Sequence, residues 1–143
     1  MHNSGISHYK LKLYGQDKVM EILLFVNDNI LIRSSFQNYL ESVGYKVDAC
    51  TDGKEALSKF EENEYDLVLL DMNLPSISGV DLIKSIREIN AAIPILVFCT
   101  IEYDCNSVQQ YVQGFFNQST SERELVEKIK VAIEKSKGTD ATG

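Results

Sequence analysis

The stretch that decides the fold is Tyr65–Gly79, which reads Tyr-Asp-Leu-Val-Leu-Leu-Asp-Met-Asn-Leu-Pro-Ser-Ile-Ser-Gly. The aliphatic run from Leu67 to Leu70 predicts a strand buried on both faces, as in parallel sheets. The run ends on the carboxylate of Asp71, and the proline and glycine that follow predict a loop. Asp71 is therefore expected at the carboxyl end of a central strand, where open α/β sheets place ligands and chemistry.

The length and charge of the chain limit its class. Its 143 residues suit one domain with a full core, and its net charge of −7 disfavours direct binding to nucleic acid or to an anionic membrane. No apolar stretch is long enough to span a bilayer. We expect a flexible N-terminal extension at residues 1–19, a domain at 20–136, and a polar tail or truncated linker at 137–143.

The chain has three cysteines, Cys50, Cys99 and Cys105. Their number is odd and they lack metal-ligand spacing, so we expect a reduced, cytoplasmic protein. Cys50 and Cys99 fall at the ends of expected strands, where a cysteine usually acts as a small apolar filler.

Strands and helices alternate along the chain. The strands are expected at residues 20–26, 45–50, 67–70, 93–99 and 114–116. Helical periodicity follows each of them, weakly in the segment 100–112 and strongly after Thr120 or Ser121. Short connections and right-handed crossovers then predict a single doubly wound, five-stranded parallel sheet with helices on both faces.

Several residues at the expected strand ends resemble the receiver domain of bacterial response regulators, over about residues 20–135. They are Asn27 and Asp28 after the first strand, Asp71 with Pro75 and Gly79 after the third, and Pro94 at the start of the fourth. The resemblance implies the flavodoxin-like strand order 2-1-3-4-5, in which the first and third strands are neighbours. Asp28 and Asp71 are then expected close together.

The resemblance also implies a chemistry. Phosphoryl transfer to a carboxylate needs a balancing cation, and magnesium with oxygen ligands supplies that charge. By resemblance, Asp71 is the phosphoacceptor and a metal ligand, Asp28 is a second ligand, and Asn73 contributes its backbone carbonyl. The implied partners are a histidine kinase or phosphotransfer protein and a downstream protein that binds the face formed by residues 100–135, with Phe115 at the switch-aromatic position.

Three positions depart from the family pattern. Asn27 stands where the family usually has an acid, Cys99 where it has a serine or threonine, and Gln118 where it has a lysine. Strand alternation is expected to point Thr100 to the face opposite the site. A unit charge at about 4 Å is worth roughly 4 kcal/mol gross at an effective dielectric near 20, so these losses predict a degenerate, weakly reactive site.

Other interpretations remain open at this point. The chain can be a pseudo-receiver that binds proteins without phosphorylation, or a flavodoxin-like enzyme or cofactor carrier on the same fold. Asp28 can simply cap the helix that follows it, and Asp71 can cap a turn.

Overall fold

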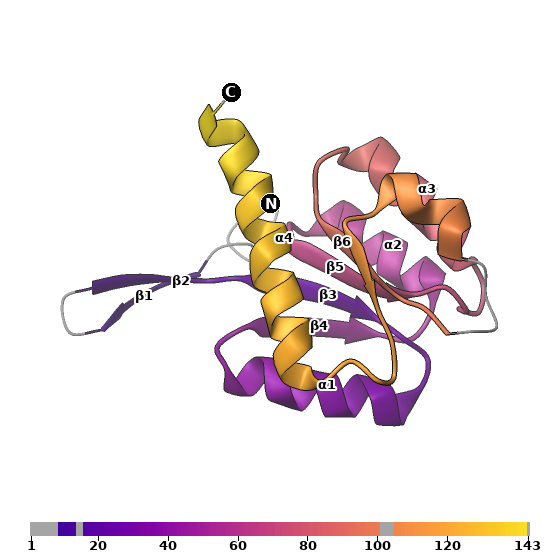
Figure 1. Cartoon of the computed structure of the whole chain (residues 1–143), viewed down its shortest axis with the longest axis horizontal. Coiled ribbons are helices and arrows are strands. Elements are labelled where there is room, and N and C mark those ends of the chain that lie inside the picture. Colours follow the sequence, from indigo (N-terminus) through magenta and orange to yellow (C-terminus); the bar gives the residue numbers. More distant parts are fainter. Residues whose placement is uncertain (1–8, 14–15, 101–104, 143) are drawn as a thin grey trace.

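The central element is a five-stranded parallel sheet. The structure is a computed structural model that describes residues 9–13, 16–100 and 105–142. Its sheet runs in the order β4-β3-β5-β6-β7 (Figure 1). The strands are β3 (Ile22–Val26), β4 (Lys46–Cys50), β5 (Leu67–Asp71), β6 (Ile95–Phe98) and β7 (Gly114–Phe116). Counted from β3 the order is 2-1-3-4-5, which confirms the predicted fold.

Helices cover both faces of the sheet (Figure 1). The helices are α1 (Ile30–Ser42), α2 (Gly53–Glu62), α3 (Gly79–Ile89) and α4 (Glu122–Thr142), with a short 3-10 helix η2 (Cys105–Tyr111). Buried side chains of α1 and α4 pack on one face, and those of α2, α3 and η2 pack on the other. This division follows from strand alternation, because successive residues of each strand point to opposite faces.

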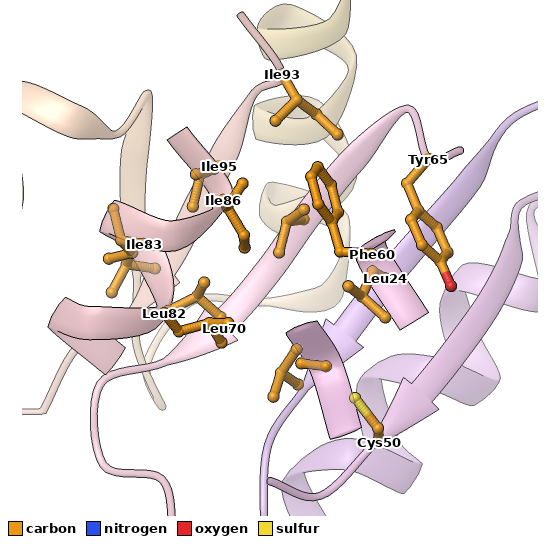
Figure 2. Close-up of a cluster of buried hydrophobic side chains, with 14 of the residues drawn as sticks. Leu24, Cys50, Phe60, Tyr65, Leu70, Leu82, Ile83, Ile86, Ile93 and Ile95 are labelled. Carbon is orange, nitrogen blue, oxygen red and sulfur yellow. The ribbon is translucent and has the colours of Figure 1, made fainter. Parts of the chain in front are cut away.

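The core on the α2–α3 face shows why the aliphatic runs form strands. Leu24 of β3, Leu70 of β5 and Ile95 of β6 belong to one buried cluster with Ile83 of α3 (Figure 2). All four are fully buried. Each such side chain contributes about 1.5–3 kcal/mol relative to an exposed one. Because both faces of the sheet are covered, the strands need continuous apolar runs.

The helix ends follow the expected capping rules. Asn29 caps α1, because its side chain accepts from the backbone N–H groups of Leu31 and Ile32. A glycine directly after a run of helical periodicity predicts a left-handed helix terminator, and Gly44, just after the same helix, confirms it with φ of +107°. Before α4, Ser121 and Glu124 each accept from the other's backbone N–H at 3.0 Å, a capping box.

The two ends of the described chain differ from the prediction. Residues expected in a loose extension form an antiparallel hairpin of β1 (Tyr9–Leu13) and β2 (Gln16–Met20), which extends away from the main sheet in Figure 1. Residues 138–142, expected in an unfolded tail, continue α4. Extending an existing helix is far easier than nucleating one, and Lys137 pairs with Glu21 at 3.5 Å.

Among the described residues, no helix combines the length and apolar character needed to cross a bilayer.

Arg87 connects α3 to the segments around β6 and β7. Its guanidinium donates to the carbonyl oxygens of Tyr111 at 2.9 Å and Ile93 at 2.7 Å. It also donates to the carbonyl of Asn90 at 3.2 Å and to Oε1 of Gln113 at 3.0 Å. Burial lowers the pKa of Arg87, and the four acceptors offset that cost.

We expect Arg87→Lys to lower the free energy of unfolding by about 2 kcal/mol or more, measured by urea denaturation. Lysine keeps the charge, but its single nitrogen cannot reach four divergent acceptors. The control is Lys84→Ala on the exposed side of the same helix, with an expected change within about 0.5 kcal/mol. Equal stability of Arg87→Lys and the wild type would contradict the bridging role.

Candidate functional site

The site lies at the carboxyl edge of the sheet, and strand register decides which side chains meet there. Val26 of β3 pairs with Leu70 of β5, and Asp71 pairs with Phe98 of β6. One residue beyond Val26, Asn27 therefore lies beside Asp71. Strand alternation puts Asn27 and Asp71 on the same side of the sheet as the buried residues that face α1 and α4.

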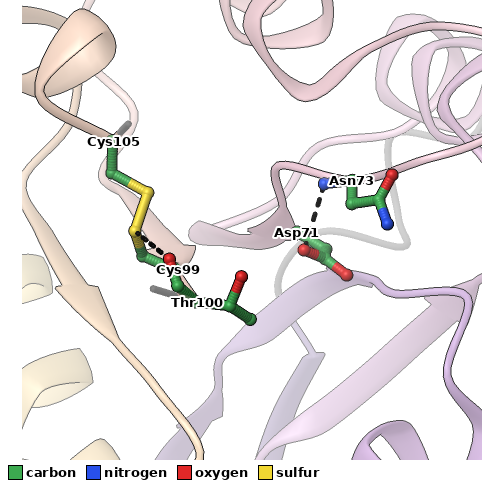
Figure 3. The surroundings of a disulfide bond; sticks show 5 residues. All are labelled: Asp71, Asn73, Cys99, Thr100 and Cys105. Atoms are coloured by element: carbon green, nitrogen blue, oxygen red, sulfur yellow. Dashed lines mark hydrogen bonds between the residues drawn. A yellow bond between two sulfur atoms is a disulfide. The ribbon is translucent and has the colours of Figure 1, made fainter. Parts of the chain in front are cut away.

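Asp71 is a buried carboxylate. The residue is 9% exposed, and Oδ1 accepts from the backbone N–H of Asn73 at 3.1 Å (Figure 3). Burial raises the pKa of Asp71 above its ordinary value, and the negative charge of Asp28 raises it further. Backbone N–H groups of Asn73 and Met72 act in the opposite direction. The ionised form is therefore only partly stabilised, which favours the arrival of a positive charge.

Asn27 is fully buried at the end of β3. Its Oδ1 accepts from the N–H of Asn29 at 2.8 Å, and its carbonyl accepts from Nη1 of Arg33 at 2.7 Å. Its Nδ2 has no hydrogen-bond partner within the described part of the chain. A buried amide nitrogen without a partner beside Asp71 is a donor available to a ligand.

Asp28 is exposed and follows Asn27 directly. The alternative that it caps α1 is wrong, because Asn29 makes the capping hydrogen bonds. Its charge acts on Asp71, so the two carboxylates lie in one electrostatic neighbourhood. The hydrogen bond of Asp71 to Asn73 is a local turn bond, and it uses only one of the two carboxylate oxygens.

The loop after Asp71 is held in place by close backbone contacts. A Cβ on Gly79 would lie 2.5 Å from Cα of Met72, so no side chain fits there. Ser76 has φ of +69°, which costs about 1 kcal/mol or more for a residue with a side chain. Its hydroxyl accepts from the N–H of Lys54 at 3.2 Å and contacts Oδ1 of Asp52 at 3.4 Å. The loop is therefore docked on the start of α2.

The structure corrects the expected position of Thr100. Phe98 shares the face of Asp71, so Thr100, two residues later, shares it too. Figure 3 shows Thr100 between Asp71 and the cysteines, and its buried Oγ1 has no partner among the described residues. The expectation that Thr100 points away from the site is therefore wrong. The family pattern places its serine or threonine at Cys99, one residue earlier, and an offset of one residue changes the face.

The cysteines also differ from the prediction. Cys99 and Cys105 form a disulfide with their Cα atoms 6.3 Å apart, so the expectation that all cysteines are reduced is wrong for this pair. Cys99 packs towards the α2–α3 face, as alternation requires. Cys50 is buried and free, which confirms its prediction as an apolar filler. Two cysteines six residues apart carry no sequence signal that tells a disulfide from two thiols.

The remaining predicted residues lie around this edge. Asn73 is exposed in the loop after β5. Gln118 is exposed and lines an open cavity of about 340 Å³ with Phe98, Ser121 and residues of α1. Phe115 is partly buried against the α2–α3 core. The partner-binding face was predicted over residues 100–135. Within it, residues 101–104 lie outside the described residues.

The donor set at this edge fits magnesium. The candidate ligands are the carboxylates of Asp28 and Asp71 and the carbonyl of Asn73, all hard oxygens. Burial and the charge of Asp28 disfavour the ionised carboxylate of Asp71, and a cation bound there would stabilise it. Among the described residues no group of three or more His, Cys, Asp or Glu side chains gathers, so backbone oxygen and water would complete the shell.

Comparison with known proteins decides the family. The model of the response regulator receiver domain matches residues 23–130. The chain belongs to that family. The regulatory protein VanRB of Enterococcus faecalis is 32% identical over 117 residues, which cover 80% of this chain and 53% of that protein. ResD of Bacillus subtilis, a transcriptional regulatory protein, is 32% identical over 120 residues, or 82% and 50%.

Solved receiver structures share the fold. The chemotaxis response regulator CheY4 of Vibrio cholerae superposes with a TM-score of 0.71 at 27% identity, covering 79% of this chain and 98% of that one. A receiver domain protein of Methanospirillum hungatei superposes with a TM-score of 0.76 at 24% identity, covering 84% of this chain and 98% of that one. The receiver spans about half the length of the curated relatives it matches.

The buried charge of Asp71 predicts a pH-dependent stability. A pKa raised by folding means that ionised Asp71 opposes folding at pH 7. We therefore expect Asp71→Asn to raise the free energy of unfolding at pH 7 by roughly 1 kcal/mol. As the pH falls, wild-type Asp71 protonates in the folded state, and the difference should vanish below about pH 4, near the pKa of an unfolded aspartate.

Urea denaturation of both proteins between pH 3.5 and 8 measures this effect. The matched control is Glu61→Gln, an exposed carboxylate on α2, which should leave stability within about 0.5 kcal/mol at every pH. A destabilised Asp71→Asn at pH 7 would contradict the unfavourable charge.

Proposed function

We propose that this receiver accepts a phosphoryl group on Asp71 in two-component signal transduction. The observation that carries the proposal is the row of Asn27, Asp71 and Thr100 on one face of the sheet edge, with Asp28 beside it. In the step, a carboxylate oxygen of Asp71 forms a bond to phosphorus. The bond from phosphorus to the donor's leaving group breaks, and that group departs with the electron pair.

The chain's own residues have distinct roles in this proposal. The N–H of Asn73 donates to Oδ1 of Asp71 and orients the carboxylate for attack. Thr100 Oγ1 and Asn27 Nδ2, both buried without partners in the described structure, would donate to terminal phosphoryl oxygens. Asp28, Asp71 and the carbonyl of Asn73 would hold magnesium, which supplies positive charge against the phosphoryl group.

The site is less charged than the family pattern, and we propose that it reacts slowly. Asn27 offers an amide in place of a carboxylate, and Gln118 offers an amide in place of an ammonium. Thr100 would supply a hydroxyl next to Cys99, which stands where the family has a serine or threonine. The site would therefore react slowly because it lacks one negative and one positive charge of the family pattern. It would not react slowly for want of a hydroxyl.

The phosphoryl donor would be a histidine kinase or phosphotransfer protein that approaches α1. Ile30 and Leu31 at the start of this helix are 63% and 79% exposed, next to Asp28. Exposed large apolar side chains beside a reactive edge are typical of a protein-binding surface. A downstream partner would use the face of η2, β7 and α4, and we place the protein in the cytoplasm, where such kinases transfer phosphate.

A second function is favoured by the missing charges. With amides at Asn27 and Gln118, the chain can act as a pseudo-receiver whose surfaces bind proteins without phosphorylation. The two functions differ in one measurable property, the modification of Asp71.

The test is incubation with acetyl phosphate and magnesium, followed by intact mass spectrometry. We expect one phosphoryl adduct that forms in wild type and in Glu61→Gln but not in Asp71→Asn. Excess EDTA should prevent it, and Asp28→Asn should slow it by at least about 10-fold, the lower range for weakened metal sites. Absence of the adduct in folded wild type would reject phosphorylation and favour the pseudo-receiver.

A further inference from the structure

A disulfide joins the end of β6 to the start of η2 beside the reactive edge. Cys99 follows directly on β6, Cys105 begins η2, and their Cα atoms are 6.3 Å apart, within the range that a disulfide can bridge. Figure 3 shows Thr100 between this bond and Asp71. The disulfide therefore lies next to the hydroxyl that shares the face of the phosphoacceptor.

Both ends of the disulfide are attached to rigid parts of the domain. The N–H of Cys99 donates to the carbonyl of Phe116 at 2.8 Å, which continues the pairing of β6 with β7. The sulfur of Cys99 contacts the carbonyl oxygen of Thr100 at 3.6 Å. Cys105 is buried, and Val108 in the same short helix is fully buried. The bond thus fixes Thr100 relative to a helix anchored in the core.

The pair is chemically set apart from the third cysteine. Cys99 is the partly exposed end of the disulfide, and Cys105 is buried. Cys50 is 2% exposed. Burial is the main reason that its pKa is raised to about 12, and the nearby acid Glu55 adds to the effect. A thiol with that pKa stays protonated and unreactive near neutral pH. Exchange is therefore confined to Cys99 and Cys105.

We propose that Cys99 and Cys105 form a reversible redox switch that sets the rate at which Asp71 accepts a phosphoryl group. The inference rests on the proposed function, because its output is phosphorylation of Asp71. The oxidant is a low-molecular-weight disulfide such as oxidised glutathione. One cysteine thiolate attacks this disulfide and releases one thiol, and the second thiolate then attacks the mixed disulfide and releases another.

The exchange balances in atoms and electrons. Two protein thiols lose two electrons and two protons, and the small disulfide gains them as two thiols. In a reducing compartment the same exchange runs backwards and opens the bond. A disulfide that can open and close in this way fits a regulatory role, because persistent structural disulfides belong to oxidising compartments.

The disulfide acts on phosphorylation through Thr100. A phosphoryl group adds three terminal oxygens to Asp71, and the unpartnered hydroxyl of Thr100 would donate to one of them. The covalent bond on the preceding residue restricts movement of Thr100 towards these oxygens, because it ties Cys99 to the buried start of η2. The oxidised protein is therefore the slow acceptor, and the reduced protein is the fast one.

The experiment compares one protein in two redox states. Wild type is prepared oxidised with oxidised glutathione or reduced with a phosphine, desalted, and checked by iodoacetamide alkylation and mass. Adduct formation with acetyl phosphate and magnesium is then followed over time. We expect the oxidised form to react at least about 5-fold more slowly, the lower range of coupling between two sites.

Two variants sharpen the comparison. Cys105→Ser cannot form the bond, so it should react at the fast rate after either treatment. Cys50→Ala removes the buried thiol and keeps the pair, so it should retain the difference between the two states. Because the main comparison needs no substitution, it stands even where a variant folds poorly.

The outcomes separate the two proposals. Equal rates in the verified oxidised and reduced proteins, with the adduct present in both, would overturn the switch and leave the proposed function intact. No adduct in either state would reject the proposed function and the switch together. A faster oxidised form would also overturn the switch as stated.

Discussion

The register of three parallel strands is the constraint on which the candidate site depends. β3 and β6 both pair with β5, so the pairing of Val26 with Leu70 and of Asp71 with Phe98 fixes the neighbours of Asp71 on both sides. A slip of one residue in either pairing would turn a polar side chain away from the site and an apolar one towards it. The continuous apolar cores on both faces prevent that slip.

The same packing that fixes the register also makes the site electrostatically unfavourable. Asp71 ends a strand whose other residues are fully buried, so its carboxylate loses most of its hydration. Asp28 adds a second negative charge, and the backbone N–H groups of Asn73 and Met72 stabilise the ionised form of Asp71. The packing of the apolar core thus offsets the cost of burying the Asp71 carboxylate. A bound cation would stabilise that carboxylate. Stability and reactivity at this edge are opposed for the same physical reason.

The sequence is informative about features with a local physical signature. The buried strands, the glycine after α1 and the position of Asp71 follow from aliphatic runs, helical period and turn residues, and the structure confirms them. The strand Tyr9–Leu13 of the hairpin is absent from the prediction, although the alternation Tyr-Lys-Leu-Lys-Leu is a strand signal.

Features that depend on pairing between distant residues could not be predicted in this way. The face of Thr100 follows from the register of β6 with β5, which the sequence alone does not determine. The bond between Cys99 and Cys105 requires a turn that brings their Cα atoms within reach, and the spacing alone does not establish it. The roles of Asp28, Asn73 and Phe115 stay predictions, since they depend on ligands and partners.

The central claim is that Asp28 and Asp71 share one electrostatic environment. Titration of the Asp71 side-chain carboxyl by carbon-13 NMR tests it directly, in wild type and in Asp28→Asn. The wild-type pKa should lie above the ordinary aspartate value of about 3.9, and it should fall in the variant because a neighbouring negative charge is removed. A pKa of Asp71 that is unchanged by Asp28→Asn would contradict the claim.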